Sequence, residues 1–152
     1  MFRINKAYTK SKLFDQNTFY DAFTKDLKHA RHRVIIESPF ITTKRFATIY
    51  PLLQKATKHK VKIIINTRNP IEHGLSMRNQ ALECISFLQD IGVDVFYTSG
   101  LHRKVAIIDN VVWEGSLNIL SQSNSCEIMR RTESSENTNQ LIKFVKMSRW
   151  YN

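Results

Sequence analysis

The sequence is poor in cysteine, in acidic residues and in long apolar runs, and each shortage excludes a class of protein. Its two cysteines, Cys84 and Cys126, have neither the spacing of a metal site nor the density of a disulfide framework. Residues 1–6 lack the apolar run of a secretory signal, and no stretch is long enough to cross a bilayer. We therefore expect a cytoplasmic protein with reduced thiols and no membrane contact.

Metal-binding clusters are missing as well, because the sequence offers no compact group of Asp, Glu and His ligands. We expect no metal and no other cofactor. Repeats, linkers and low-complexity segments are also lacking. The 152 residues contain 42% hydrophobic and 24% charged side chains, which is ordinary for a globular protein, so we expect one domain over residues 1–152.

Positive charge is abundant, and it is unevenly distributed. The net charge is +10. Residues 1–78 hold 16 lysines and arginines against 5 acidic residues, a net charge of +11, whereas residues 79–152 hold 7 against 8, a net charge of −1. Excess lysine can simply be solvated surface, but such a field also binds phosphate backbones without sequence preference. Together with the phosphate-type site described below, it favours nucleic acid as a partner.

Apolar runs and helical stripes alternate along the chain. This order predicts an α/β fold with a mixed, largely parallel central sheet, helices on both faces and a hairpin that carries the active site. The expected helices are 17–30 with Asn17 as N-cap, 42–59 bent or split at Pro51, 79–91, and a closing helix from 137 that includes Trp150. The expected strands are 34–36, 61–66, 93–97, 105–108, 111–113 and 126–129, with an edge strand or docked arm within 1–14 and a loop at 67–78.

The run from His102 to Glu127 holds a dense set of reactive groups. His102 and Lys104 precede an apolar strand, and the two-residue period of a strand places them on one face. Asp109-Asn110 is turn sequence, so a hairpin follows. A three-residue connection would place Lys104 opposite Ser116 and His102 opposite Asn118. A two-residue connection would move Ser116 and Asn118 to the other face. We favour the three-residue connection.

The spacing His102-x-Lys104, Asp109, Gly115-Ser116-x-Asn118 and then Glu127 resembles the signature of the phospholipase D superfamily. The order of strands and helices from about 34 to 127 is similar as well. This chain carries one copy of the motif. The resemblance implies a small nuclease in which two identical subunits pair about a two-fold axis to complete the site. It also implies a phosphohistidine intermediate, with His102 of the second subunit protonating the leaving group.

The chemistry of the side chains suggests their roles. His102 can attack phosphorus through one ring nitrogen if a carboxylate holds the other, and Glu127 is the candidate. Lys104, Asn118 and the Ser116 hydroxyl would stabilise the charge on the phosphoryl oxygens. Structural support is expected from Asp109 and Gly115. Substrate contacts are expected from Arg68, Arg78, Lys44, Arg45, Arg103 and Ser38, whereas we expect structural or surface roles for His29, His32, His59 and His73.

Three functions compete. The first is a homodimeric, metal-independent phosphodiesterase that acts as an endonuclease on DNA, or alternatively RNA, with little sequence specificity. The second is a catalytically silent nucleic-acid-binding module of the same fold. The third is a phospholipid phosphodiesterase, which we rank last because the sequence has no amphipathic membrane helix.

Overall fold

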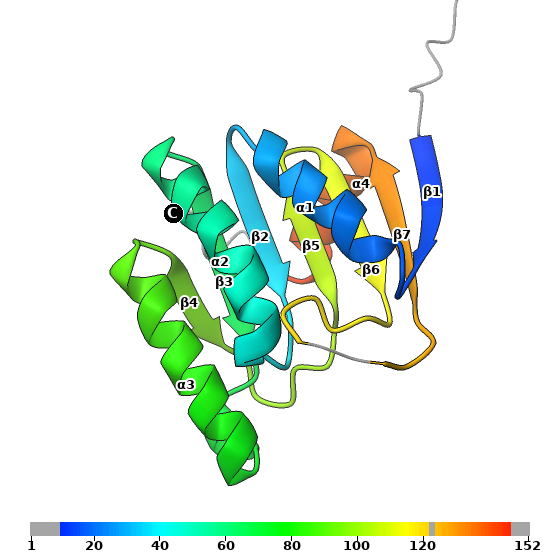
Figure 1. Ribbon diagram of the computed structural model, residues 1–152. Coiled ribbons are helices and arrows are strands. Elements are labelled where there is room, and N and C mark those ends of the chain that lie inside the picture. The colour runs from blue at the N-terminus through cyan, green and yellow to red at the C-terminus, as the bar shows by residue number, and fades with distance from the viewer. Residues whose placement is uncertain (1–9, 122–123, 147–152) are drawn as a thin grey trace, which may run out of the picture.

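The protein is built on a mixed sheet of seven strands. The computed structural model describes residues 10–121 and 124–146, and its strand order is β1-β7-β6-β5-β2-β3-β4 (Figure 1). Two of the six neighbouring pairs in this region are parallel, β2–β3 and β3–β4, and the others are antiparallel. The sheet is thus mixed as expected, but it is not largely parallel. The strands are β1 Lys10–Asp15, β2 Arg33–Glu37, β3 Lys62–Thr67, β4 Asp94–Tyr97, β5 Val105–Ile108, β6 Val111–Gly115 and β7 Ile128–Glu133.

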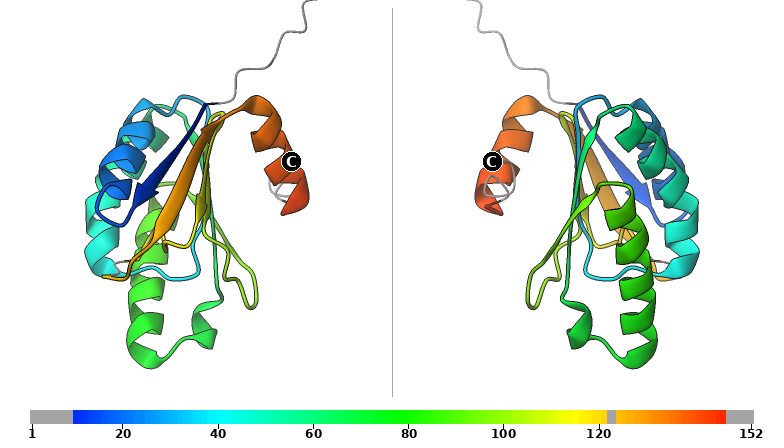
Figure 2. Two further views of the ribbon diagram at one scale, coloured as in Figure 1. Left: turned by 90° about the vertical axis from the view of Figure 1, so that its right-hand side faces the viewer. Right: turned by 90° about the vertical axis from the view of Figure 1, so that its left-hand side faces the viewer.

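Helices lie on both faces of the sheet, which confirms the expected layers. Three long helices cover one face, and the last helix lies alone on the other (Figure 2). The first three follow from crossover connections between strands, whereas the last follows an antiparallel strand and can therefore reach the opposite face. The helices are α1 Phe19–His29, α2 Thr43–Lys58, the 3-10 turn η1 Pro70–Glu72, α3 Leu75–Asp90 and α4 Ser135–Phe144.

Successive apolar side chains of the central strands point to opposite faces of the sheet and so form two separate cores. In β2, Val34 and Ile36 face the large core beneath α1, α2 and α3, while Ile35 faces the smaller core beneath α4. The neighbouring strands β3 and β5 alternate in the same way, because successive strand residues point to opposite faces. The apolar runs of these strands therefore reflect a sheet that is covered on both sides.

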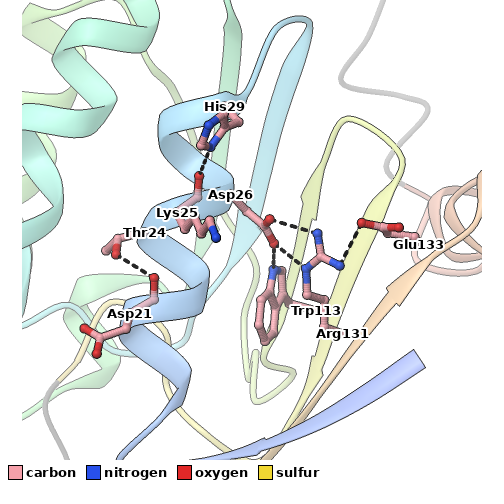
Figure 3. Close-up of polar contacts among 8 residues, drawn as sticks. All are labelled: Asp21, Thr24, Lys25, Asp26, His29, Trp113, Arg131 and Glu133. Atoms are coloured by element: carbon pink, nitrogen blue, oxygen red, sulfur yellow. Dashed lines mark hydrogen bonds and ion pairs between the residues drawn. The ribbon is translucent and has the colours of Figure 1, made fainter. Parts of the chain in front are cut away.

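One polar cluster fastens α1 to the antiparallel side of the sheet. The Asp26 carboxylate accepts hydrogen bonds from Trp113 Nε1 at 2.8 Å and from Arg131 Nε and Nη2 at 2.8 and 2.9 Å (Figure 3). Arg131 also pairs with Glu133 at 2.9 Å. Phe19 and Phe23 pack their rings on the same indole, which is fully buried. One carboxylate thus joins α1, β6 and β7.

Several element boundaries differ from the expected ones. The N-cap of α1 is Thr18 rather than Asn17, and α3 begins at Leu75 rather than 79, which shortens the loop that precedes it. The last strand begins at Ile128, so Glu127 lies just before it. The edge strand expected near the N-terminus is β1, paired with β7. Trp150, expected in the closing helix, lies outside the described residues.

Pro51 does not divide α2, which is one helix of 16 residues. Proline removes one backbone donor and normally breaks or kinks a helix. Here Pro51 is on the exposed side of α2, where water can satisfy the carbonyl that loses its partner. The opposite side is anchored in the core by Ile49, Leu53 and Ala56. Packing therefore outweighs the local cost, and of the two expected alternatives, a bend or a split into two short helices, the split was wrong.

Candidate active site

The predicted reactive residues gather at one end of the sheet. His102 and Lys104 come just before β5, whose first residue, Val105, pairs with Glu37 at the carboxyl end of β2. Gly115 is the last residue of β6, and Glu127 immediately precedes β7. All of these positions lie at the edge where the parallel strands β2 and β3 end. In open α/β sheets this is the edge where ligands bind.

The hairpin has a two-residue connection, so the expected register was wrong. Ile108 pairs with Val111, and the turn consists of Asp109 and Asn110 alone. Asp109 adopts a φ of 51°, which suits the tight turn that two-residue hairpins require. Extending this register places Lys104 opposite Gly115, not opposite Ser116. Ser116 and Asn118 lie beyond the end of β6, so the path of the chain after Gly115, and not the strand register, sets the direction of their side chains.

Gly115 permits that departure because the backbone of β7 passes directly beside it. A Cβ atom at this position would lie 2.0 Å from the Ile128 carbonyl oxygen, and the glycine φ is 158°. Ser116 then bonds to the same residue of β7: its amide donates to the Ile128 carbonyl at 2.9 Å, and its hydroxyl accepts from the Ile128 amide at 3.0 Å. The Ser116 hydroxyl is therefore occupied by the backbone of β7.

Lys104 and His102 differ sharply in exposure. Lys104 is 8% exposed, and its Nζ donates to the carbonyl oxygen of His102, whereas the His102 side chain is exposed. Burial lowers the pKa of Lys104, the Glu127 carboxylate opposes this shift, and the Arg68 cation adds to it. Lys104, Glu127 and Arg68 thus lie within electrostatic reach of one another.

Tyr20 belongs to the same group, although the sequence did not single it out. Its hydroxyl donates to the carbonyl oxygens of Ser121 and Asn118, at 2.8 and 3.2 Å. The guanidinium carbon of Arg45 lies 3.3 Å from the centre of its ring. Burial raises the pKa of Tyr20 to about 12, Arg45 opposes the shift, and Glu127 adds to it. Tyr20 therefore links α1 and α2 to the segment that carries Asn118.

Two polar atoms in this group are buried and have no hydrogen-bond partner among the described residues. They are Asn118 Oδ1 and Arg45 Nε. Buried polar atoms in folded proteins are nearly always paired, so water or a ligand can satisfy this acceptor on Asn118 and this donor on Arg45. A 180° rotation of the Asn118 amide would present its NH2 donor at the same point.

A buried carboxylate holds the segment that carries His102 and Lys104. Glu37 is fully buried at the end of β2. Arg103 donates a hydrogen bond to each of its carboxylate oxygens, from Nε at 2.9 Å and from Nη2 at 2.8 Å. Asn66 Nδ2 donates to the same carboxylate at 2.7 Å, and Thr98 donates to Asn66 Oδ1 at 3.0 Å. Arg103, expected to contact substrate, is therefore committed to Glu37, although its side chain remains 46% exposed.

Glu37 and Asn66 could have been recognised from their positions. Each is a polar residue that ends an otherwise apolar strand, and the two strands are parallel neighbours. Charged or amide side chains at adjacent strand ends lie close together. The sequence could not show that Arg103 pairs with them, because that contact depends on the path of the loop between β4 and β5.

The remaining predicted substrate contacts have different outcomes. Ser38 is fully buried, donates to the Phe40 carbonyl at 2.9 Å and accepts from the Leu120 amide at 3.1 Å, so it braces two loops and cannot reach a substrate. Arg68 Nε donates to the Leu101 carbonyl at 2.9 Å. Arg78 donates to the Ile71 carbonyl at 3.1 Å. Lys44 is exposed at the first turn of α2.

Asp109 lies at the opposite end of β5, in the hairpin turn, where its carboxylate binds backbone amides. Its carboxylate accepts hydrogen bonds from three consecutive backbone amides of the segment between α1 and β2, at 3.0, 2.8 and 3.1 Å. These amides belong to Arg31, His32 and Arg33. The hairpin turn is thus tied to the start of the central strand β2.

His73, expected on the surface or in a structural role, is buried on the ring of Phe40 with the centroids 5.1 Å apart. Burial lowers its pKa, and the nearby Arg68 cation adds to the shift. Within residues 10–121 and 124–146, no group of three or more His, Cys, Asp or Glu side chains could hold a metal ion. In the same ranges, no helix is both long and apolar enough to cross a bilayer.

The family follows from a sequence profile. Residues 23–148 match the family described as cardiolipin synthase, PLD-like domain. The match covers most of the chain and includes the whole segment from His102 to Glu127. The fold and the family match define a protein of the phospholipase D type. The chain belongs to this PLD-like family, and it is an enzyme that acts on phosphodiester bonds.

Three solved structures share this fold. NucT from Helicobacter pylori is 21% identical, with a TM-score of 0.74 over 92% of this chain and 95% of that chain. Nuc from Salmonella typhimurium, a phospholipase D family member, is 16% identical, with a TM-score of 0.75 over 95% of both chains. TrmBL2, an archaeal chromatin protein, is 13% identical, with a TM-score of 0.62 over 97% of this chain and 55% of its own. No curated protein sequence matches significantly.

Proposed function

We propose that the protein is an endonuclease that hydrolyses DNA, or alternatively RNA, with little sequence specificity and without a metal ion. The observation that carries this proposal is the arrangement at the strand ends. There, exposed His102 adjoins buried Lys104, the Glu127 carboxylate lies within electrostatic reach of Lys104, and Asn118 Oδ1 and Arg45 Nε are unpaired. His102 supplies a nucleophile, and Lys104, Arg45 and the NH2 of a rotated Asn118 amide supply donors for phosphoryl oxygens.

In the proposed reaction, one ring nitrogen of His102 attacks phosphorus, and the bond from phosphorus to the leaving oxygen breaks. The leaving oxygen takes a proton from His102 of a second subunit. Water then gives a proton to that second histidine and attacks the phosphohistidine, which releases the product and restores His102. Lys104 and Asn118 stabilise the charge on the nonbridging oxygens, and Glu127 supports the positive charge on the imidazole.

The proposal requires a symmetric dimer, because one motif provides one histidine and the reaction uses two. A two-fold axis near the strand ends would bring two copies of His102 face to face. The exposure of His102 supports this arrangement, since its imidazole is accessible to a second copy. The Lys104 ammonium has three donors, of which one is taken by the His102 carbonyl, so two remain for a phosphate.

Nucleic acid is the proposed substrate class because of the charge distribution. The first half of the chain has a net charge of +11 and includes Lys44, Arg45 and Arg68 near the site. Such a surface attracts a polyanionic backbone and binds it with little dependence on base sequence. A phospholipid substrate would instead require an apolar entry surface.

The test is to incubate the purified protein with plasmid, single-stranded DNA, RNA and phosphatidylcholine vesicles in excess chelator, beside the His102→Ala protein. We expect the nucleic acid to be cleaved at an unchanged rate in chelator and the variant to be inactive. Lys10→Ala, which removes an exposed lysine of β1, serves as the matched control and should retain full activity.

Each other result contradicts a named part of the proposal. Cleavage that stops in chelator would overturn the metal-free mechanism, and binding without cleavage would favour a silent nucleic-acid-binding module. Hydrolysis of the lipid alone would overturn the substrate class. Sedimentation tests assembly separately, because a fully active monomer would contradict the shared site.

A further inference from the structure

A second cationic site lies at the opposite end of the sheet. A cavity of about 610 Å³ is lined by residues where α1 and α2 end and β2 and β3 begin. These ends of α1, α2 and β2 lie in the upper part of Figure 1. The active site lies where these same parallel strands finish. Six of the residues that line the cavity are basic, namely Lys28, His29, Arg31, His32, Lys55 and His59.

No acidic residue lines this cavity. Within the described residues, Lys28, Lys55 and Arg31 form no ion pair. The Asp109 carboxylate accepts hydrogen bonds from the backbone amides of residues 31–33 and so places one negative charge at this end of the sheet. This single negative charge offsets only part of the positive charge of Lys28, Arg31 and Lys55.

Helix dipoles explain only part of this cluster. Lysines in the last turns of α1 and α2 complement the negative ends of both helices, which accounts for Lys28 and Lys55. Arg31 and His32 lie beyond the end of α1 and gain nothing from that effect, which fades within the last turn. Their presence in the same cavity points to an external anion.

In two of the histidines, Nδ1 forms a hydrogen bond with a backbone carbonyl and Nε2 takes no part in that bond. Nδ1 of His29 lies 2.7 Å from the Lys25 carbonyl oxygen (Figure 3), and Nδ1 of His59 lies 2.8 Å from that of Lys55. A carbonyl can only accept, so each Nδ1 carries the proton. Each Nε2 stays outside these bonds and, when protonated, can donate to a phosphoryl oxygen.

The helix α2 connects this cavity with the active site. Its 16 residues include no acidic side chain, and its exposed positions Lys44, Thr48, Pro51, Lys55 and Lys58 recur at helical spacing. At ~1.5 Å per residue the helix is about 24 Å long, which corresponds to about seven nucleotides at ~3.4 Å each. Lys44 marks the active-site end of this stripe, and Lys55 and Lys58 mark the cavity end.

We infer that this cavity binds the phosphodiester backbone of the nucleic-acid strand held in the active site, about seven nucleotides from the bond that is cut. The inference rests on the proposed function for its substrate class. The site would increase affinity for long strands and leave the chemistry unchanged, because it touches none of the reactive groups.

The experiment removes three cations from the cavity and compares the result with an equal loss elsewhere. The test variant is Lys28→Gln/Arg31→Gln/Lys55→Gln. The control is Lys10→Gln/Lys12→Gln/Lys143→Gln, which changes exposed lysines on β1 and α4. Both sets are made in the His102→Ala protein, and binding of labelled single strands of about 4 and about 20 nucleotides is followed by fluorescence anisotropy over a range of salt.

For the long strand, we expect the test variant to bind about tenfold more weakly, with a salt slope that falls by about 2 from the loss of three phosphate contacts. The control should change much less. The short strand should bind all three proteins equally, and Lys28→Arg/Arg31→Lys/Lys55→Arg should restore the affinity.

Equal weakening by the test and control variants would overturn the inference, and so would weakening that is the same for short and long strands. Failure of the conservative triple variant to restore affinity would also overturn it. None of these outcomes depends on cleavage. A protein that binds long strands through the cavity but never cuts them would contradict the proposed function while supporting this site.

Discussion

Gly115 is the residue on which the geometry of the hairpin end depends. The chain leaves β6 here, and the Ile128 carbonyl lies where a side chain would begin. Any Cβ at this position must push β7 away from β6 and displace Ser116, which bonds to Ile128 through both its amide and its hydroxyl. The segments that carry Asn118 and Glu127 both start from this contact.

Replacing Gly115 with alanine should therefore lower the free energy of unfolding by about 2–4 kcal/mol, because the clash involves backbone on both sides. Urea unfolding followed by circular dichroism measures the change. Gly74→Ala is the matched control, since no atom lies within 4 Å of the position of its Cβ. We expect that control to cost less than about 1 kcal/mol. A similar cost for both variants would contradict the close approach.

Tyr20 should make the protein less stable in alkali. Its pKa is about 12 in the folded chain because the hydroxyl is buried, against 10.0 in the unfolded chain. Between these values the folded state keeps a proton that the unfolded state has lost, so stability falls as pH rises above 10. The loss attributable to Tyr20 amounts to about 2–3 kcal/mol by pH 12.

Chemical unfolding at pH 9 and at about pH 11 measures this effect, and Tyr20→Phe is the comparison. The variant should lose less stability than the parent over this interval, although it starts lower because two carbonyls lose their donor. Identical pH dependence of the two proteins would show that the Tyr20 hydroxyl is not buried as described.

At this scale the sequence is informative only where residue type and spacing combine. The spacing from His102 to Glu127 predicted a candidate catalytic segment, and Gly115 was expected to lend structural support. Tyr20 was missed because it lies 82 positions before His102 and follows Phe19 in an amphipathic helix, so no local pattern distinguishes it. Long-range contacts of this kind follow from the packing of helices, which no short motif records.

At the scale of elements, Asp26 joins α1 to β6 and β7. Its carboxylate accepts three hydrogen bonds, two of them from Arg131, which is largely buried. Asp26→Ala would leave the Trp113 NH without its partner and the Arg131 guanidinium paired with Glu133 alone. We expect a loss of about 2–4 kcal/mol in the free energy of unfolding, measured with urea.

Asp21→Ala provides the control for this prediction, because Asp21 lies on the exposed side of the same helix. It favours the helix only through its place in the first turn, so its loss should cost about 0.3–1 kcal/mol. If the two variants were equally stable, the Asp26 cluster would contribute nothing to the attachment of α1.

The loop between β4 and β5 depends on the pairing of Arg103 with Glu37. Arg103 separates His102 from Lys104 in the sequence, so the ion pair fixes the backbone on which both reactive residues are carried. Arg103→Ala should reduce kcat by at least about tenfold with little change in KM, because it disturbs positioning and not substrate contact.

Arg103→Lys should restore only part of the rate, because an ammonium cannot grip both oxygens of the carboxylate. Arg130→Ala, at an exposed arginine of β7, is the control and should retain normal kinetics. A large rise in KM with kcat unchanged would instead assign Arg103 to substrate binding.

Element order was predictable from the sequence, but pairing was not. Strand, helix, strand alternation identified β2, β3 and β4 and their crossovers, since these connections allow one common arrangement. The hairpin register was wrong, because Asp109 and Asn110 suffice for the turn and Val111 belongs to the strand. Sequence alone does not distinguish a two-residue from a three-residue connection when a β-branched residue follows the turn.

At the scale of the whole molecule, the basic residues and the candidate catalytic residues come from different halves of the chain. Most basic residues of the first half lie on or beside α1, α2 and the loop that follows β3, whereas the reactive run lies in the second half of the chain. Lys44, Arg45 and Arg68 lie at the same end of the sheet as the candidate catalytic residues, whereas Lys28, Arg31 and Lys55 lie at the opposite end. A cationic surface for the substrate and a compact set of reactive groups thus come from different halves of one chain.

The most direct test of the central claim is to trap the covalent intermediate. An oligonucleotide with ³²P in its internal phosphodiesters is mixed with the protein in excess chelator and quenched in alkaline detergent. We expect label on the protein that is stable in alkali and lost in acid, as a phosphohistidine requires, and none on the His102→Ala protein. Label retained by that variant, or cleavage by it at the parent rate, would contradict the account.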